Sequence, residues 1–338
     1  MNVIEIEGDL EEGGGQILRT SLALSAHTGK PFRIRRIRAR RSPPGLKAQH
    51  LAGVRLVEQL TRADVEGARP GSTALTFIPT RQATGSHRID VGTAGSVTLL
   101  AQAALLPSLT SLQPVELELI GGTDVAWAPP VDYLARVLLP YYRRLGEVEL
   151  TLERRGFHPK GGGRLRLKIQ GQPSELPPLL LARPPSLSWH GSSVASHDLA
   201  QRRVAERQAE AARELLPGLE VESSYDRTGS TGSVLTLWAA AESAPWPLRV
   251  GADQLGRKGL SAEEVGRKTA SLLKQRLSRP QPVEEHLADN LIPFLGLFGG
   301  RIACQQVTPH TRGNAYVVEQ FLPVRFEISE HEVACAPS

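Results

Sequence analysis

One pattern of strands and helices recurs three times along the chain, and this internal repeat constrains the fold more than any other feature. The spacing of apolar residues predicts the order β-α-β-α-β-β in residues 3–79 and again in residues 88–169. Residues 285–338 show the same order without a clear first strand. In each unit a proline-bearing loop precedes the second helix. Such a repeat predicts a mixed α/β (α+β) protein whose three copies pack against one another.

The segment between the second and third units has a different character. Two proline pairs, Pro177-Pro178 and Pro184-Pro185, are typical of a linker. Beyond them the apolar pattern predicts two charged helices and several short strands. We therefore predict a catalytic domain formed by residues 1–182 and 279–338, with a small α/β domain inserted at residues 183–278.

Composition excludes several classes of protein. Apolar residues make up 40% of the chain and charged residues 22%, which argues against long disordered regions. The longest apolar run, residues 96–109, contains Gln102 and Pro107 and is too short to cross a bilayer. Residues 1–12 are acidic and lack the features of a signal peptide. With two cysteines, which cannot form a disulfide scaffold, the chain is expected to be cytoplasmic and to avoid membranes.

A dense cluster of arginines lies within residues 33–41, in a chain whose formal net charge is +5. Arginine binds phosphate through two parallel hydrogen bonds, so the cluster suggests a polyanionic ligand. A solvated strand edge would have the same composition. The arginines alone leave both interpretations open.

A glycine-rich segment, Gly13–Gly15, connects a predicted strand to a predicted helix. Glycines there let backbone N–H groups approach a phosphate at the helix N-terminus. Glu12 would repel that phosphate unless a divalent cation lay between them, so it is a candidate metal ligand. The alternative is a flexible turn with capping acids. A second run, Gly161–Gly163, precedes a strand and is predicted to be a structural turn.

His310 lies in the predicted loop before the second helix of the third unit. A neutral imidazole, with a reference pKa of about 6.5, is a competent nucleophile near pH 7. The matching loop of the first unit carries Arg38 and Arg41, whose charge would favour attack on an anionic phosphate. A hydrogen-bonded packing histidine is the alternative. Walker A, Rossmann and H-E-x-x-H motifs do not occur in the sequence.

Seven motifs in a fixed order make the chain resemble the RNA 3′-terminal phosphate cyclase family over nearly its whole length. They are E-G-G-G-Q-I-L-R, R-x-x-R-x-x-P-G-L-x-x-Q, G-x-A-G-S-x-T-L-x-x-Q, G-G-T-D, R-G-F-x-P-x-G-G-G, H-L-A-D and the loop of His310. The resemblance implies three β-α-β-α-β-β repeats around a pseudo-threefold axis with a thioredoxin-like insert. It also implies that ATP adenylylates a histidine and that AMP passes to an RNA 3′-phosphate. The neighbouring 2′-hydroxyl then closes a 2′,3′-cyclic phosphate.

The resemblance also implies roles for individual residues. His310 matches the histidine that carries AMP, and Glu12 matches an acidic position linked to Mg²⁺ or Mn²⁺. The positions that match ATP-binding residues are Gln102, Pro129, His286, Leu287, Ala288, Asp289 and Asn290. Those that match residues of the phosphate and RNA site are Arg19, Arg38, Arg41 and Gln49. Two positions depart from the pattern, because the family commonly has Gln at Asn290 and Thr at Gly313.

Two other functions remain to be weighed. A non-catalytic, cyclase-like RNA-binding factor of ribosome biogenesis would keep the fold and the basic surface without the nucleophile. The presence of His310, Glu12 and Arg19 favours an enzyme. An enolpyruvyl transferase would have two similar halves, and no comparable second half is visible. We therefore expect a nucleotidyl-transferring ligase-type enzyme that acts on ATP and on RNA with a 3′-phosphate end.

Overall fold

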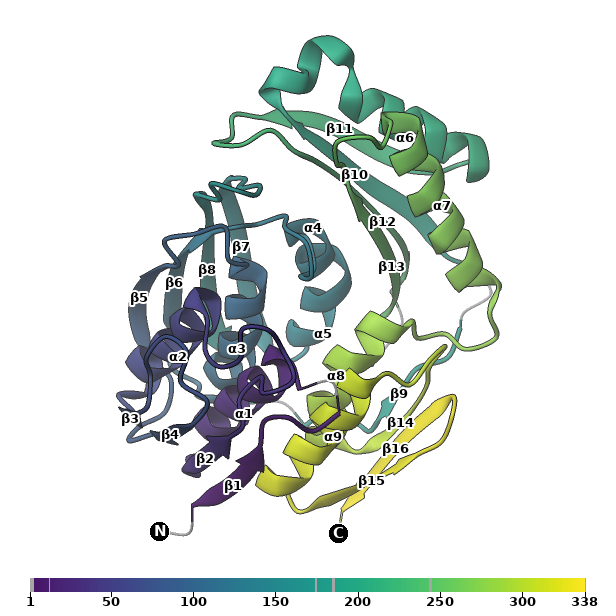
Figure 1. Cartoon of the computed structure of the whole chain (residues 1–338). Coiled ribbons are helices and arrows are strands. Elements are labelled where there is room, and N and C mark those ends of the chain that lie inside the picture. Colours follow the sequence, from purple (N-terminus) through teal and green to yellow (C-terminus); the bar gives the residue numbers. More distant parts are fainter. Residues whose placement is uncertain (1–2, 12, 174, 184–185, 243–244, 338) are drawn as a thin grey trace.

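The computed structural model has a mixed α/β fold, which confirms the expected fold class (Figure 1). The residues it describes are 3–11, 13–173, 175–183, 186–242 and 245–337. Three four-stranded sheets and their helices form one body, and a fourth four-stranded sheet with its own helices lies beside it.

The first unit is built on one of these sheets. Its elements are β1 (Ile4–Glu7), α1 (Gly15–Thr28), β2 (Phe32–Arg35), α2 (Ala48–Thr61), β3 (Asp64–Glu66) and β4 (Leu75–Ile78). The strand order is β1-β2-β4-β3; β1 and β2 are parallel and the other pairs antiparallel. Strand β2 ends at Arg35 because Arg36 and Arg38 have positive φ angles of 53° and 52°, which turn the backbone out of the sheet.

The second unit repeats this arrangement. Its elements are β5 (Gly85–Asp90), α3 (Val97–Thr110), β6 (Val115–Gly121), α4 (Val131–Tyr133), η1 (Leu134–Leu138), α5 (Leu139–Tyr142), β7 (Gly146–Arg154) and β8 (Gly163–Gly171). The order β5-β6-β8-β7 has the same strand directions as the first sheet. The π-helical turn η1 ends at Leu138, two residues before Pro140, which lacks the N–H that a regular helix would direct to the carbonyl of Arg136.

The third unit has the first strand that the sequence pattern did not reveal. Its elements are β9 (Leu179–Leu180), α8 (Glu285–Phe298), β14 (Gly300–Ala303), α9 (Pro309–Phe321), β15 (Val324–Ile328) and β16 (Glu332–Pro337). Strand β9 runs parallel to β14 in the order β15-β16-β14-β9. A strand of two residues is too short to show alternation, which explains why the sequence pattern did not predict it. The three sheets thus share strand order and direction.

The chain between β9 and α8 forms the fourth sheet. Its elements are β10 (Ser188–Ser196), η2 (His197–Arg202), α6 (Val204–Leu215), β11 (Glu220–Asp226), β12 (Ser233–Ala241), β13 (Leu248–Leu255) and α7 (Ala262–Ser278). The order is β11-β10-β12-β13, and only β10 and β11 are parallel. Val250 and Ala252 belong to the small core of this part, whereas Gly251 between them lies against the ring of Tyr133 in the main body. Because side chains alternate across a strand, the sheet separates its own core from the main body.

Two further expectations concern the whole chain. Among the helices of the described ranges, none is both long and apolar enough to cross a membrane. Cys304 and Cys335 are buried free thiols, and burial raises the pKa of each to about 11. The predicted boundaries of the insert at 183 and 278 stay a prediction.

Candidate active site

His310 lies in the first turn of α9, and not in a preceding loop as the sequence pattern suggested. Thr308 caps this helix, because its Oγ1 accepts hydrogen bonds from the backbone N–H groups of His310 (3.0 Å) and Thr311 (3.1 Å). Pro309 occupies the first helical position, where its missing N–H has no cost. The Thr-Pro pair is a helix-start signal, and it fixes His310 on a rigid element.

The carboxyl group of Asp289, in α8, holds the start of α9 in place. Its Oδ1 accepts hydrogen bonds from the hydroxyls of Thr308 (2.7 Å) and Thr311 (2.6 Å). Its backbone carbonyl accepts a third from Asn314 Nδ2 (2.7 Å). Burial raises the pKa of Asp289 to about 6, although the two hydroxyl hydrogen bonds oppose this shift. Asp289 therefore connects the predicted ATP-binding segment to the helix of His310.

The glycine-rich segment, His310 and Arg41 lie close together. A Cβ atom placed on Gly14 would lie 3.8 Å from Cε1 of His310 and 3.9 Å from Nη2 of Arg41. Gly14 immediately precedes α1, so the N-termini of α1 and α9 approach the same point. Helix N-termini and an arginine both favour a bound anion. Glu12, the predicted metal-linked acid, lies outside the described residues.

His50 is a neighbour of this site that the sequence analysis missed. Its ring packs against the backbone of Gly15, and its Nδ1 accepts a hydrogen bond from the backbone N–H of Lys47 (3.1 Å). Burial, with Arg38 and Arg19 nearby, lowers the pKa of His50 to about 4. His50 is therefore neutral at physiological pH and acts as a wall of the site. A lone histidine in a helix gave no signal of this role.

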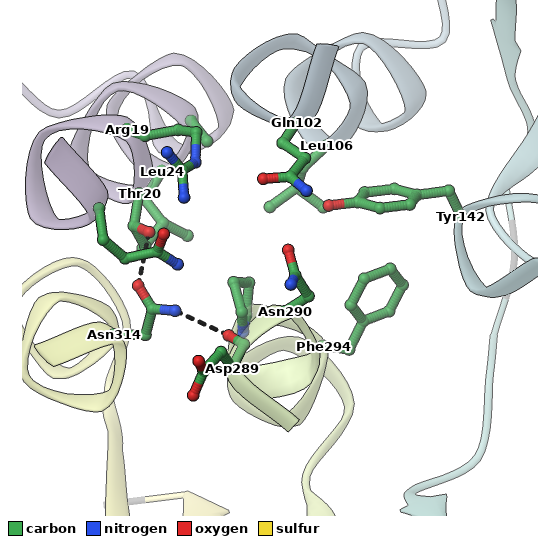
Figure 2. Close-up of a pocket in the computed structure, with 13 residues that line it drawn as sticks. Arg19, Thr20, Leu24, Gln102, Leu106, Tyr142, Asp289, Asn290, Phe294 and Asn314 are labelled. Atoms are coloured by element: carbon green, nitrogen blue, oxygen red, sulfur yellow. Dashed lines mark hydrogen bonds between the residues drawn. The ribbon is translucent and has the colours of Figure 1, made fainter. Parts of the chain in front are cut away.

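A pocket with polar and apolar walls lies where helices from all three units meet (Figure 2). Arg19 from α1, Gln102 from α3, Tyr142 from α5 and Asn290 from α8 all point towards its centre. The complete lining is Gln16, Arg19, Thr20, Ala23, Leu24, Gln102, Leu106, Tyr142, Asp289, Asn290, Pro293, Phe294 and Asn314. Four predicted residues from three motifs, Arg19, Gln102, Asp289 and Asn290, therefore line one pocket.

Two nitrogen donors of this pocket lack partners in the described part of the chain. Gln102 is 7% exposed, and its Nε2 makes no hydrogen bond. Arg19 likewise makes no hydrogen bond or ion pair with any described residue, and burial lowers its pKa to about 10. An unpaired buried donor such as Nε2 of Gln102 is costly, and Arg19 is a half-buried cation beside it, so both groups are suited to an acceptor that enters from outside. The cavity of about 30 Å³ admits water but is too small for a nucleotide without side-chain movement.

Three other predicted residues hold the framework together. Nη1 of Arg38 donates to the carbonyls of Pro43 (3.1 Å) and Gly45 (2.7 Å), so this guanidinium braces its own loop. Oε1 of Gln49 accepts from the backbone N–H of Ser96 (2.7 Å), which connects α2 to the start of α3. The carbonyl of Pro129 accepts a hydrogen bond from the hydroxyl of Thr98 (2.7 Å).

The run from 286 to 290 contributes unequally to the site. Leu287 and Ala288 are fully buried in the main core, so their side chains cannot contact a ligand. His286 is exposed at the start of α8. Nδ2 of Asn290 donates to the carbonyl of His286 (2.7 Å), which draws this side chain back along its own helix. Gly313, the other departure from the family pattern, packs towards Ile17 of α1.

The G-G-T-D and R-G-F motifs form a single buried assembly. Nη1 of Arg155 contacts both carboxylate oxygens of Asp124, at 3.1 and 3.0 Å, and Nη2 lies 2.6 Å from Asp132. Burial by itself would lower the pKa of Arg155, but the charges of these two carboxylates outweigh that effect and raise it. A Cβ atom on Gly163 would lie 2.6 Å from the backbone nitrogen of Gly156. The second glycine run is therefore a structural turn, as predicted.

Within the described ranges, no group of three or more His, Cys, Asp or Glu side chains could hold a metal ion. Mg²⁺ does not need such a group, because it commonly keeps several waters and binds through one or two carboxylates together with substrate phosphates.

Comparison with known proteins gives a consistent result. The family model described as RNA 3′-terminal phosphate cyclase matches residues 10–328. A protein of that name from Methanopyrus kandleri is 44% identical, and the match covers 98% of this chain and 97% of the relative. Proteins of the same name from Thermococcus gammatolerans and Pyrococcus furiosus are each 43% identical, over 97% and 96% of this chain and 95% of each relative.

Proposed function

The chain belongs to the RNA 3′-terminal phosphate cyclase family and is an enzyme of that family, and from this premise we propose its mechanism. ATP drives conversion of an RNA 3′-phosphate into a 2′,3′-cyclic phosphate, with His310 as the nucleophile. The observation that carries the proposal is the position of His310 in the capped first turn of α9, beside Gly14 and Arg41. A non-catalytic RNA-binding role is not favoured, because this arrangement supplies a nucleophile within an anion-binding environment.

The proposed reaction has three substitutions at phosphorus. A ring nitrogen of His310 attacks the α-phosphorus of ATP, and the bond to the bridging oxygen breaks to release pyrophosphate. An oxygen of the RNA 3′-phosphate then attacks the same phosphorus, and the N–P bond breaks to free the histidine. Finally the 2′-hydroxyl loses its proton and attacks the 3′-phosphorus, and AMP leaves. Activation is needed because AMP is a far better leaving group than hydroxide, and the adjacent 2′-hydroxyl gains from proximity.

The remaining residues would position and stabilise charge. Arg41 and the N-termini of α1 and α9 would neutralise the phosphates, and the unpaired donors of Arg19 and Gln102 would bind acceptor atoms in the pocket. His286, Pro129, Asp289 and Asn290 would form the ATP-binding wall. Leu287 and Ala288 could contribute only backbone groups, since their side chains are buried. Arg38 and Gln49 would act mainly by holding the loops.

A divalent cation, Mg²⁺ or Mn²⁺, fits this proposal as a companion of the triphosphate. Glu12 would be its protein carboxylate. When bound, such an ion would neutralise charge on the phosphates and on the departing pyrophosphate. Cytoplasmic location stays a prediction.

Trapping the covalent intermediate tests the mechanism. With ATP labelled at the α-phosphate and a divalent metal, the protein should acquire label that is acid-labile and stable to base, as expected of a phosphoramidate. ATP labelled at the γ-phosphate should give none. His310→Ala should abolish labelling while the protein stays folded, yet it should still cyclise RNA that was adenylylated beforehand. Undiminished labelling of a folded His310→Ala protein would refute the assignment.

A further inference from the structure

Trp127 has an unusual position in the loop that connects β6 to α4 (Figure 1). Its side chain is 100% exposed, and among the described residues it is the only aromatic residue in the exposed class. Its φ angle is 67°, a left-handed conformation that bulky side chains rarely adopt. Exposing a large apolar ring to water is unfavourable, and so is the left-handed backbone conformation. Backbone strain of this kind is characteristic of functional positions.

The loop of Trp127 is held firmly at both ends. The backbone N–H of Val131 donates to the carbonyl of Thr123 (3.1 Å) and to Oδ1 of Asp124 (3.3 Å). Asp124 is in turn fixed by Arg155, and the carbonyl of Pro129 is held by Thr98. Trp127 is therefore presented from a braced loop, two residues before a predicted ATP-binding position.

The neighbouring surface carries positive charge. The carbonyl of Gly156 accepts hydrogen bonds from the backbone N–H groups of Thr123 (2.9 Å) and Asp124 (3.4 Å), which joins this loop to the segment that follows β7. The exposed basic side chains at the end of β7, in the segment that follows it and in the adjacent turn of the insert are Arg154, His158, Lys160 and Arg227. Lys160 is tied to that turn by a hydrogen bond from its backbone N–H to Oγ of Ser230 (3.0 Å).

We propose that Trp127 is a stacking platform for a base of the RNA close to its 3′-phosphate end. This inference rests on the proposed function, because it names how the same site holds its RNA. An exposed aromatic ring beside a basic rim is the usual arrangement for binding single-stranded nucleic acid. Small nucleotides instead bind in concave pockets that bury most of their surface. The residue Trp127 is fully exposed and is not buried in such a pocket, which favours RNA over the adenine of ATP.

Three variants separate stacking from structure. Trp127→Ala removes the platform. Trp127→Phe keeps an aromatic face but removes the indole fluorophore at this position, while the other three tryptophans of the chain remain. Leu112→Ala is the matched control, because Leu112 is also exposed (47%) with a positive φ of 58°. It follows the C-terminal end of α3, about 20 Å along that helix from the end near Pro129.

Each variant would be assayed with a 3′-phosphorylated oligoribonucleotide and, separately, for enzyme–AMP formation without RNA. Trp127→Ala should raise the KM for RNA and the Kd of the oligonucleotide by about tenfold, a typical effect of losing one stacked base. Its thermal stability, its KM for ATP and its enzyme–AMP formation should stay unchanged. Trp127→Phe should bind RNA nearly as well as the parent but lose the quenching of tryptophan fluorescence on binding. Leu112→Ala should resemble the parent throughout.

The outcomes distinguish this inference from the proposed function. RNA binding by Trp127→Ala within twofold of the parent would overturn the platform. A raised KM for ATP with unchanged RNA binding would assign the ring to adenine and also overturn it. If the parent forms no enzyme–AMP, the proposed mechanism fails, but oligonucleotide binding still tests the platform.

Discussion

Oδ1 of Asp289 accepts a hydrogen bond of 2.6 Å from the hydroxyl of Thr311, and this bond joins α8 to the first turn of α9. The same oxygen accepts a hydrogen bond from Thr308, the cap of α9. The segment predicted to bind ATP and His310, the proposed nucleophile, are thus connected by a buried carboxyl group.

Two substitutions of Asp289 should distinguish the effect of its hydrogen-bonding oxygen from the effect of its charge. Asp289→Ala leaves the buried hydroxyl of Thr311 and the half-buried hydroxyl of Thr308 without their acceptor, and it should lower the free energy of unfolding by about 1–3 kcal/mol. Enzyme–AMP formation should fall sharply, because the first turn of α9 loses its anchor. Asp289→Asn keeps an oxygen at the Oδ1 position and should retain stability and most of the labelling. Equal losses in both variants would show that the charge itself is required.

Arg38 and Arg41 should respond differently to substitution by lysine. Arg38 bridges two carbonyls through one nitrogen, and a lysine ammonium has a different geometry, so Arg38→Lys should lower the Tm. Arg41 is exposed beside Gly14, so Arg41→Lys should leave the Tm nearly unchanged. Its enzyme–AMP formation should nevertheless fall by at least about tenfold. Thermal melts and labelling rates measured on both variants check this contrast. Normal labelling by Arg41→Lys would place Arg41 outside the active site.

The insert is connected to the active-site helix α8 by a buried ion pair. Arg276, in α7, lies 3.5 Å from Glu284 and donates to the carbonyl of Gly251 (2.5 Å). Glu284 is fully buried, accepts from the hydroxyl of Tyr133, and caps α8 through the backbone N–H of His286 (2.7 Å). Arg276→Met should therefore destabilise the protein by about 3–5 kcal/mol, because it leaves a buried carboxylate without its cation.

A compensating substitution provides the control. Arg276→Met combined with Glu284→Gln should recover much of the lost free energy of unfolding in a denaturant titration. Replacing residues 183–278 by a short linker also removes Arg276 and leaves Glu284 without its cation. The deletion protein should therefore fold more readily when it also carries Glu284→Gln. That protein should still form some enzyme–AMP if the insert supplies no catalytic group. A folded deletion protein unable to bind ATP would contradict this expectation.

His50 predicts a dependence of stability on pH. Burial lowers its pKa in the folded state from the ordinary 6.5 to about 4. Below pH 6.5 His50 therefore binds a proton in the unfolded chain but not in the folded protein. The free energy of unfolding should fall as the pH decreases towards 4. The loss should reach about 1–3 kcal/mol and should be absent from His50→Gln. Denaturant titrations from pH 7.5 to 4.5 test the difference between the two proteins. Identical pH profiles would show that His50 is solvated.

The sequence by itself determined those features that depend on local pattern. Apolar periodicity predicted the helices and most strands of the three units, because each segment must bury one face. The resemblance carried by the motifs implied that His310, Arg19, Gln102, Asp289 and Asn290 are site residues, and this stays a prediction. The run Gly161–Gly163 was predicted from the sequence to be a turn, and Gly163 does come into close backbone contact with Gly156.

The tertiary structure decided what depends on contacts between distant segments. Strand β9 and the position of His310 within α9 were missed, because two residues show no alternation and the Thr308 cap needs Asp289 to hold it. The roles of His50 and Trp127 gave no signal in the sequence. His50 is neutral because it is buried, and Trp127 is fully exposed, and both properties depend on which other residues surround the side chain. The bracing of its own loop by Arg38 was likewise visible only in the structure, and its expected place beside a phosphate stays a prediction. Residue type indicates the chemistry that a side chain can perform, and only the fold decides which partner it meets.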